Sequence, residues 1–140
     1  MALQSRAAQI TPPGADRLPE AMPDMVHWLA HTGRLARVNT AETPSNGLDD
    51  DGNGYVDDVH GYDIRNHDAT PQDDNGHGSH VGSIAAASAN DAYGVAGLAW
   101  DTPLMPVKVL DHLKSGSWAD LAEGIIYAAD NGARIINLSL

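Results

Sequence analysis

The second half of the chain alternates between strand-like and helix-like segments, and this alternation constrains the possible fold more than any other feature. The segment from Ser117 to Gly132 has apolar side chains near helical spacing, with Ser117 and Asp120 placed to form a capping box and Gly132 placed to end the helix. Val-Lys-Val alternation within residues 103–111 predicts a strand before this helix, and "ARIINLSL" at residues 133–140 predicts another after it. A strand, a helix and a strand with short connections favour a right-handed parallel unit, so we expect an α/β fold.

A run of small residues, "HGSHVGSIAAASA", precedes these segments and predicts a helix that starts at His77, with Asn75 and Gly76 just ahead of it. We expect this helix to be buried, because small side chains let another backbone approach closely. Two histidines, His77 and His80, lie in its first turn. Such a pair suits either a metal site, which needs a third ligand such as His67 or a nearby aspartate, or a triad whose histidine is the general base.

The composition excludes several classes of function. The chain has 140 residues, enough for one modest domain, and its net charge of −11 opposes nucleic-acid binding. The absence of cysteine excludes disulfides, thiolate metal sites and a cysteine nucleophile. No apolar run reaches the ~20 residues that a membrane span needs, and residues 1–20 lack the apolar core of a signal peptide. We therefore expect neither nucleic acid nor a membrane as a partner.

Several motifs, taken in order, resemble those of the subtilisin-like serine proteases (subtilases, peptidase S8 type). "NGHGSHVGSIAAA" is similar to the histidine segment of that family, and "GVAGLAW", "LMPVKVLD" and "ARIINLSL" are similar to the segments that follow it. The resemblance covers residues 39–140 as a partial peptidase domain, whereas residues 1–38 form an N-terminal segment of unclear structure. It implies a parallel α/β sheet with helices on both faces, incomplete in this chain, and peptide hydrolysis by an Asp-His-Ser triad.

The resemblance also implies catalytic roles. It makes His77 the general base and His80 a structural residue of the motif. Asp24, seven residues before His31, is the candidate for the triad aspartate. The nucleophilic serine of the family lies in a Gly-Thr-Ser-Met-Ala segment, which the 140 residues do not contain, so we expect this chain by itself to be inactive.

Residues 39–76 are rich in Asn, Asp, Gly and Pro and predict a long loop, of the kind that is usually functional or held by a ligand. Four potential cation ligands fall at positions 1, 3, 5 and 9 of an EF-hand-like calcium loop, namely Asp49, Asp51, Asn53 and Asp57. Gly54 stands at the turn position, but position 12 is His60 rather than glutamate, which argues against an EF-hand proper. The alternative is a solvated acidic loop without a metal.

The segment just before His77 resembles a type of calcium loop known in the same family. The resemblance implies four ligands, which are Asp63, Asp68, Thr70 and Gln72. Mixed carboxylate, hydroxyl and amide oxygens at short spacing agree with the chemistry of a hard cation. Calcium in a structural role is therefore the expected cofactor, and the alternative is a turn-rich loop that needs no metal.

Two further segments resemble those that flank the bound peptide in this family and pair with its backbone. The first follows the Val-Lys-Val strand and comprises Lys114, Ser115 and Gly116, beside which Trp118 would form an apolar wall. The second comprises Ser139 and Leu140. The alternative for the first segment is a turn and helix cap, with Trp118 packed on the domain.

Together these features predict a serine-type endopeptidase of the subtilisin-like family that acts on polypeptides as a monomer, is extracellular in full-length form and is stabilised by calcium. Two alternatives stay open. One is a non-enzymatic calcium-binding module on a degenerate protease scaffold, and the other is a metal-dependent hydrolase built on His77 and His80.

Overall fold

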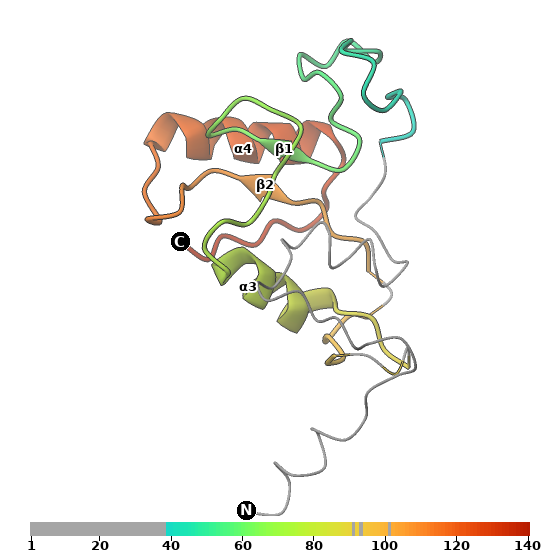
Figure 1. The fold of residues 1–140 in the computed structure, drawn as a ribbon, viewed down its shortest axis with the longest axis vertical. Helices are drawn as coiled ribbons and strands as arrows, with labels where there is room; N and C mark the ends of the chain where they lie inside the picture. Colours follow the sequence, from blue (N-terminus) through green and yellow to red (C-terminus); the bar gives the residue numbers. More distant parts are fainter. Residues whose placement is uncertain (1–38, 91, 93, 101) are drawn as a thin grey trace, which may run out of the picture.

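The computed structural model describes residues 39–90, 92, 94–100 and 102–140 (Figure 1). In chain order the elements are strand β1 (Tyr62–Asp63), helix α3 (His77–Ala86), strand β2 (Val107–Lys108) and helix α4 (Trp118–Asp130). No helix in this part of the chain is long and apolar enough to cross a membrane. Loops make up much of the rest, so side-chain hydrogen bonds carry much of the local structure.

Strands β1 and β2 form a short parallel sheet, in which Tyr62 pairs with Val107 and Asp63 pairs with Lys108. The N–H of Ile64 extends the pairing by donating to the Lys108 carbonyl at 2.9 Å. Helix α4 runs along this sheet and contacts β2 (Figure 1). The parallel pairing and the accompanying helices confirm the α/β class.

The strand expected at residues 133–140 is not formed, so the prediction of a strand–helix–strand unit around α4 is wrong in this respect. The segment pairs with no strand in the described part of the molecule. Strand β2 pairs instead with β1, which belongs to the segment that composition assigned to a loop. A strand needs a neighbour to satisfy its backbone groups, and the side chains of Ile135 and Leu138 stay 90% and 52% exposed.

Helix α4 starts and ends where the sequence predicts. Ser117 Oγ accepts from the Asp120 N–H at 3.0 Å, and the Asp120 carboxylate accepts from the Ser117 N–H at 3.2 Å, which completes the capping box. Gly132, with a φ of 81°, follows the helix, and its N–H donates to the Ala129 carbonyl. Local sequence therefore sets both ends of this helix.

Helix α3 also forms at the expected position, but it is less buried than its small residues suggest. Within it only Ala86 is buried, and Ile84 is 60% exposed. Residues 97–99 donate their N–H groups to carbonyls near its C-terminal end. Residue 97 must be glycine for this approach. A Cβ at this position would lie 2.3 Å from the Ala87 nitrogen and would clash with it. The close backbone approach therefore occurs at one end of α3 rather than along its length.

Three tyrosines dominate the small core beneath α4. The ring of Tyr55 meets those of Tyr62 and Tyr127 edge to face, with centroids 4.8 and 4.7 Å apart. Ile64 is fully buried in the same cluster. The Tyr127 hydroxyl donates to the buried carboxylate of Asp58 at 2.8 Å. Because the sequence has no phenylalanine, tyrosine supplies the aromatic packing here, and its hydroxyl ties α4 to the acidic loop.

Candidate active site and cation-binding loops

His77 is the first residue of α3 and is half-buried at the point where the acidic loop becomes a helix. Gly76 before it has a φ of 88°, a left-handed conformation that favours glycine. Because glycine has no side chain to cap the helix, Asp73 does so from further upstream. Its carboxylate accepts the N–H groups of Asn75 and Gly76 at 3.0 and 2.8 Å and that of Ser79 at 2.6 Å. Asp73 thereby fixes the start of α3 and the position of His77.

The same hydrogen bonds set the protonation of Asp73. Burial by itself raises the pKa of this carboxyl group, but the hydrogen bonds from Ser79, Asn75 and Gly76 outweigh it and hold the pKa below its ordinary value. The group therefore stays negatively charged near neutral pH. A negative charge at this position also favours the helix, because the N-terminal end of α3 carries the positive end of its dipole.

Two contacts bind the loop before α3 to β2 and to the segment after it. The Lys108 ammonium lies 2.8 Å from an Asp74 oxygen and 3.1 Å from an Asp63 oxygen. Burial lowers the pKa of Lys108, but the two carboxylates outweigh burial and raise it above its ordinary value. The Asn75 amide donates to the His112 carbonyl at 2.9 Å. The loop is thus held beside the chain that follows β2.

Among the residues that the structure describes, the two histidines of α3 gain no third metal ligand. His77 is half-buried and His80 is exposed. In the described residues, the one group of three carboxylate or imidazole ligands close enough to share an ion is Glu42, Asp49 and Asp51. Within the described part of the chain, this group lies in the first acidic loop and includes neither histidine of α3.

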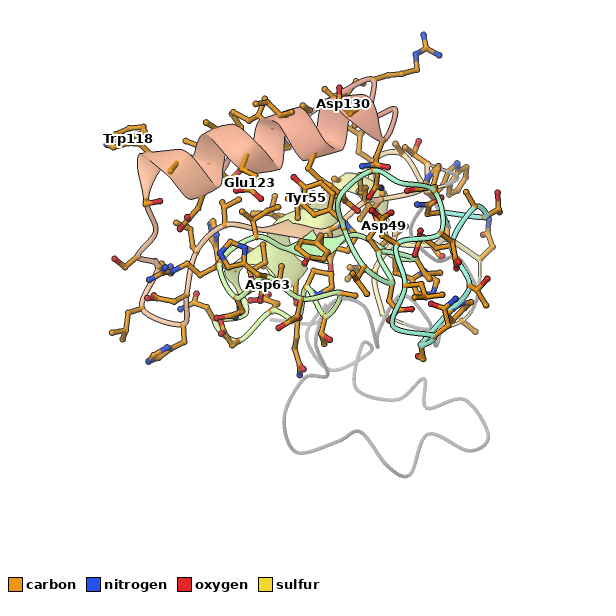
Figure 2. All side chains as sticks on the ribbon, turned by 90° about the horizontal axis from the view of Figure 1, so that it is seen from above. Asp49, Tyr55, Asp63, Trp118, Glu123 and Asp130 are labelled. Carbon is orange, nitrogen blue, oxygen red and sulfur yellow. The ribbon has the colours of Figure 1, made fainter. Side chains whose placement is uncertain are left out.

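The residues that resemble substrate-binding segments follow β2 or lie at the C-terminal end of the chain (Figure 1). Lys114 is left-handed, with a φ of 62°. At Gly116 a Cβ would lie 2.3 Å from the Val109 carbonyl oxygen. Residue 116 must therefore be glycine for the turn to lie this close to the backbone that follows β2. Trp118 is 86% exposed and projects from the first turn of α4 (Figure 2). Three further members of the set are also exposed, namely Ser115, Ser139 and Leu140.

The first acidic loop gathers carboxylates around its own backbone. Asp49 accepts hydrogen bonds of 2.7, 3.0 and 2.8 Å from the N–H groups of residues 52–54. Asp51 lies beside it, and Glu42, from the preceding turn, completes a group whose ligand oxygens lie within 4.8 Å of one another. EF-hand spacing could not include Glu42, because this residue precedes the motif and reaches it only through the fold.

The side-chain oxygens of the other two suggested ligands accept hydrogen bonds from backbone N–H groups of this loop, although Asn53 also donates to Asp49 and Asp51. Asp57 accepts from the N–H groups of Asn46 and Gly47 at 2.9 and 3.0 Å. Asn53 turns its amide oxygen to the Tyr55 N–H at 2.8 Å. The structure therefore brings together the carboxylates of Asp49 and Asp51. The side-chain oxygens of Asn53 and Asp57 instead hold the backbone of the loop in place.

The second loop is closed by two main-chain hydrogen bonds between Asp63 and Asp68, at 2.8 and 3.2 Å. Asp63 is 1% exposed, and its carboxylate accepts from the backbone and side chain of Asn66 in addition to its ion pair with Lys108. The remaining suggested ligands are exposed, and they are Asp68, Thr70 and Gln72. This oxygen donor set fits a hard cation, although Lys108 already neutralises part of the charge of Asp63.

The ordered motifs, the parallel sheet and a histidine at the start of a helix define a class of protein, and comparison with known proteins identifies it. The subtilase family (peptidase S8) matches residues 23–140, which is most of the chain. The chain therefore belongs to the subtilase family. The matched range includes Asp24, which lies outside the described residues, so its role stays a prediction.

Similar proteins include thermitase of Thermoactinomyces vulgaris, 42% identical over 113 residues that cover 81% of this chain and 40% of thermitase. The thermophilic serine proteinase of Bacillus sp. (strain AK1) is 51% identical over 82 residues, 59% of this chain and 20% of that protein. The cell wall-associated protease of Bacillus subtilis (strain 168) is 48% identical over 81 residues, 58% of this chain and 9% of that protein. The chain thus spans 40% or less of the length of these relatives.

Sequence reasoning missed several residues that organise the site, namely Glu42, Asp58, Asp73 and Lys108. One signal for Asp73 was available, because an aspartate just ahead of a helix start is a typical capping residue. No comparable signal separated Asp58 from the other aspartates around it. Its burial follows from contacts with Tyr127, which lies far along the chain.

Proposed function

We propose that this chain is the part of a secreted serine-type endopeptidase that carries the general base of an Asp-His-Ser triad. The observation that carries the proposal is the place of His77, which opens α3, is positioned by Asp73, and lies within the family match over residues 23–140. The names of two relatives, a serine proteinase and a cell wall-associated protease, support peptide hydrolysis at or beyond the cell surface.

In the proposed reaction, the His77 imidazole takes the proton of a serine hydroxyl as this attacks the peptide carbonyl. The imidazole then returns the proton to the leaving amine. Asp24 is the proposed partner that orients the ring. The serine belongs to a family segment that the 140 residues do not contain, so we propose that this chain alone does not turn over peptides.

The proposed substrates are polypeptides bound in an extended conformation to a monomeric enzyme. Backbone groups of residues 114–116 and 139–140 would pair with the peptide from its two sides, as an added strand. The exposed indole of Trp118 supports this placement, because it offers an apolar surface beside the first of these segments.

Calcium is the proposed structural cofactor, bound by the second loop through Asp63, Asp68, Thr70 and Gln72. The mixture of carboxylate, hydroxyl and amide oxygens supports this choice, because calcium takes oxygen ligands of these kinds. The ion would stiffen the loop that leads from β1 to His77. It supplies no chemistry to the proton transfers.

The test is the replacement of His77 by alanine in the natural gene product that contains this chain. We expect kcat for hydrolysis of a peptide substrate to fall about 10⁶-fold, the scale of loss when a triad histidine is removed. His112→Ala, which removes an exposed histidine on the neighbouring segment, serves as the matched control and should leave kcat within a small factor. Hydrolysis that persists in the His77→Ala variant would overturn the assignment.

The same experiment separates the proposal from its alternative, a non-enzymatic calcium-binding module on the same scaffold. Such a module would bind calcium but show no turnover that depends on His77. The 140-residue chain by itself provides a second comparison, because its peptide hydrolysis should not exceed that of its own His77→Ala variant. Turnover above that level would require a nucleophile within these residues.

A further inference from the structure

We propose that Asn75 is a deamidation site, and that its conversion to a carboxylate releases the loop before His77 from the segment that follows β2. Asparagine is a chemically labile residue, and it reacts most readily where glycine follows it, because no side chain obstructs the glycine nitrogen. The chain has four such pairs, in which the asparagine is Asn46, Asn53, Asn75 or Asn131. The proposal does not depend on the proposed catalytic activity, because the reaction uses the chain itself.

The reaction needs only the chain and water. The backbone nitrogen of Gly76 loses its proton to solvent base and attacks the side-chain carbonyl carbon of Asn75, so that a C–N bond closes a succinimide ring. The side-chain nitrogen takes up a proton, its bond to carbon breaks, and it leaves as ammonia. Water then opens the ring at either carbonyl group, which leaves aspartate or isoaspartate in place of the asparagine. No electrons are transferred.

The side chain of Asn75 is less restrained than those of the other three asparagines. It is exposed, its amide nitrogen donates to the His112 carbonyl at 2.9 Å, and its amide oxygen accepts no hydrogen bond from the described residues. In the other three asparagines both the amide nitrogen and the amide oxygen are bonded to other residues. The amide of Asn75 therefore turns toward the nitrogen of Gly76 at the lowest cost in hydrogen bonds.

One contact opposes the reaction at this site. The Gly76 N–H donates to the Asp73 carboxylate at 2.8 Å, and a negatively charged acceptor disfavours loss of the Gly76 proton. The glycine N–H groups of the other three pairs are bonded as well, to Asp57, to Asp49 and to the Ala129 carbonyl. The glycine nitrogen is thus restrained in all four pairs, and the difference between them lies in the asparagine side chain.

Conversion of Asn75 removes a donor from a contact between two distant segments. The amide bonds to the carbonyl of His112, which lies 37 residues further along the chain. A carboxylate has no proton to donate and repels a carbonyl oxygen. The new charge also lies beside Asp73, which adds repulsion at the start of α3. We therefore expect conversion to loosen the loop before His77 from residues 112–116.

The test is peptide mapping by mass spectrometry of the natural gene product that contains this chain. The protein is incubated in mildly alkaline buffer, with a serine-directed inhibitor to prevent digestion, both folded and unfolded in urea. In urea the four pairs should convert at similar rates, because glycine follows the asparagine in each. We expect Asn75 to convert several-fold faster than each of the other three asparagines in the folded protein. Equal rates in the folded protein, or faster conversion of another pair, would overturn the proposal.

Asp73→Asn tests the restraint on the Gly76 nitrogen. We expect conversion of Asn75 to become about tenfold faster or more, because a hydrogen bond to a charged group no longer has to break. Asp57→Asn, the same change at the carboxylate that holds the Gly47 N–H, is the matched control and should leave the rate at Asn75 unchanged. An unchanged rate in Asp73→Asn would contradict the restraint. Equal acceleration of all four pairs would also contradict it, because Asp73 would then only stabilise the fold.

Asn75→Asp carries the charge of one product and tests the consequence of conversion. The N–H groups of residues 113–115 bond to Asp111 within the segment that the Asn75 amide holds. We expect hydrogen exchange of these groups, measured by mass spectrometry, to be several-fold faster in the variant than in the parent. Asn46→Asp, the same change in another Asn-Gly pair, should keep the parent's exchange rate at residues 113–115. Equal rates in Asn75→Asp and the parent would show that this amide does not hold the segment.

Discussion

At the scale of single residues, the position of His77, the proposed general base, depends on the carboxylate of Asp73. Asp73 accepts three backbone N–H groups around the start of α3, and two oxygens are needed to do so. An amide at this position has only one acceptor oxygen. The side chain therefore acts as a positioning residue for His77, and its charge is part of that role.

We expect Asp73→Asn to lower the free energy of unfolding by about 1 kcal/mol, the usual cost of losing a helix N-cap. The pKa of Asp73 is lower in the folded chain than its ordinary value of about 3.9, so the unfolded chain binds the proton more tightly. The stabilisation is thus present above about pH 3.9 and is lost as the pH falls through the depressed pKa. Urea unfolding of both chains across this range should show their difference shrinking in acid, whereas the control Asp130→Asn should differ little from the parent at any pH.

At the scale of secondary-structure elements, α4 packs against the sheet through a glycine. Gly124 is buried, and a Cβ at this position would lie 2.6 Å from Val109 Cγ1 and 3.2 Å from Val107 Cγ1. These valines are β-branched and have little freedom to turn away. The absence of a side chain at residue 124 therefore sets how closely helix and strand approach.

Two effects oppose each other in Gly124→Ala, and packing should decide the outcome. Alanine favours a helix over glycine by about 1 kcal/mol, but overpacking a core costs about 1–3 kcal/mol. We expect a net loss of about 1 kcal/mol in the free energy of unfolding, measured by chemical denaturation. Adding Val109→Ala should recover part of the loss in a double-mutant cycle. A Gly124→Ala variant more stable than the parent would mean that helix and strand can move apart freely.

The elements also show what the sequence could and could not predict. Helix α4 was predictable in full, because Ser117, Asp120 and Gly132 act within one or two turns of the chain. The pairing of β1 with β2 was not, because two residue pairs leave no alternating pattern long enough to read. The place of Glu42 beside Asp49 and Asp51 was hidden for a related reason, since a spacing motif includes only residues that are close in sequence. The sequence could single out His77 because its motif is local and its neighbours follow in a fixed order, and its role as general base stays a prediction.

At the scale of the whole molecule, acidic charge dominates. The net charge is −11, and much of the acid lies in the two loops between Asn39 and Asp74. Repulsion of this kind destabilises a compact chain, and bound divalent cations reduce it more than diffuse salt does. The behaviour of the chain in calcium is therefore a property of the whole molecule as well as of each loop.

We expect calcium to raise the melting temperature of the 140-residue chain, because an ion that binds only the folded state adds about 2.7 kcal/mol at a hundredfold excess over its Kd. Differential scanning calorimetry in calcium, in chelator and in sodium chloride of equal ionic strength separates binding from screening. Asp63→Asn combined with Asp68→Asn should remove part of the increase. A melting temperature that responds equally to sodium chloride and calcium would contradict specific binding at both loops.

The pairing of β1 with β2 also sets an order of events in folding. Val107 lies 45 residues after Tyr62, so this pairing closes a loop that contains the whole of α3. Closing such a loop costs chain entropy before the new contacts compensate for it, whereas helical turns form from local contacts in about a microsecond. Helix α3 and its cap at Asp73 can therefore form early, but the distance from His77 to residues 112–118 is fixed only when the sheet closes. We therefore expect the spacing between His77 and the proposed substrate segment to be set late in folding.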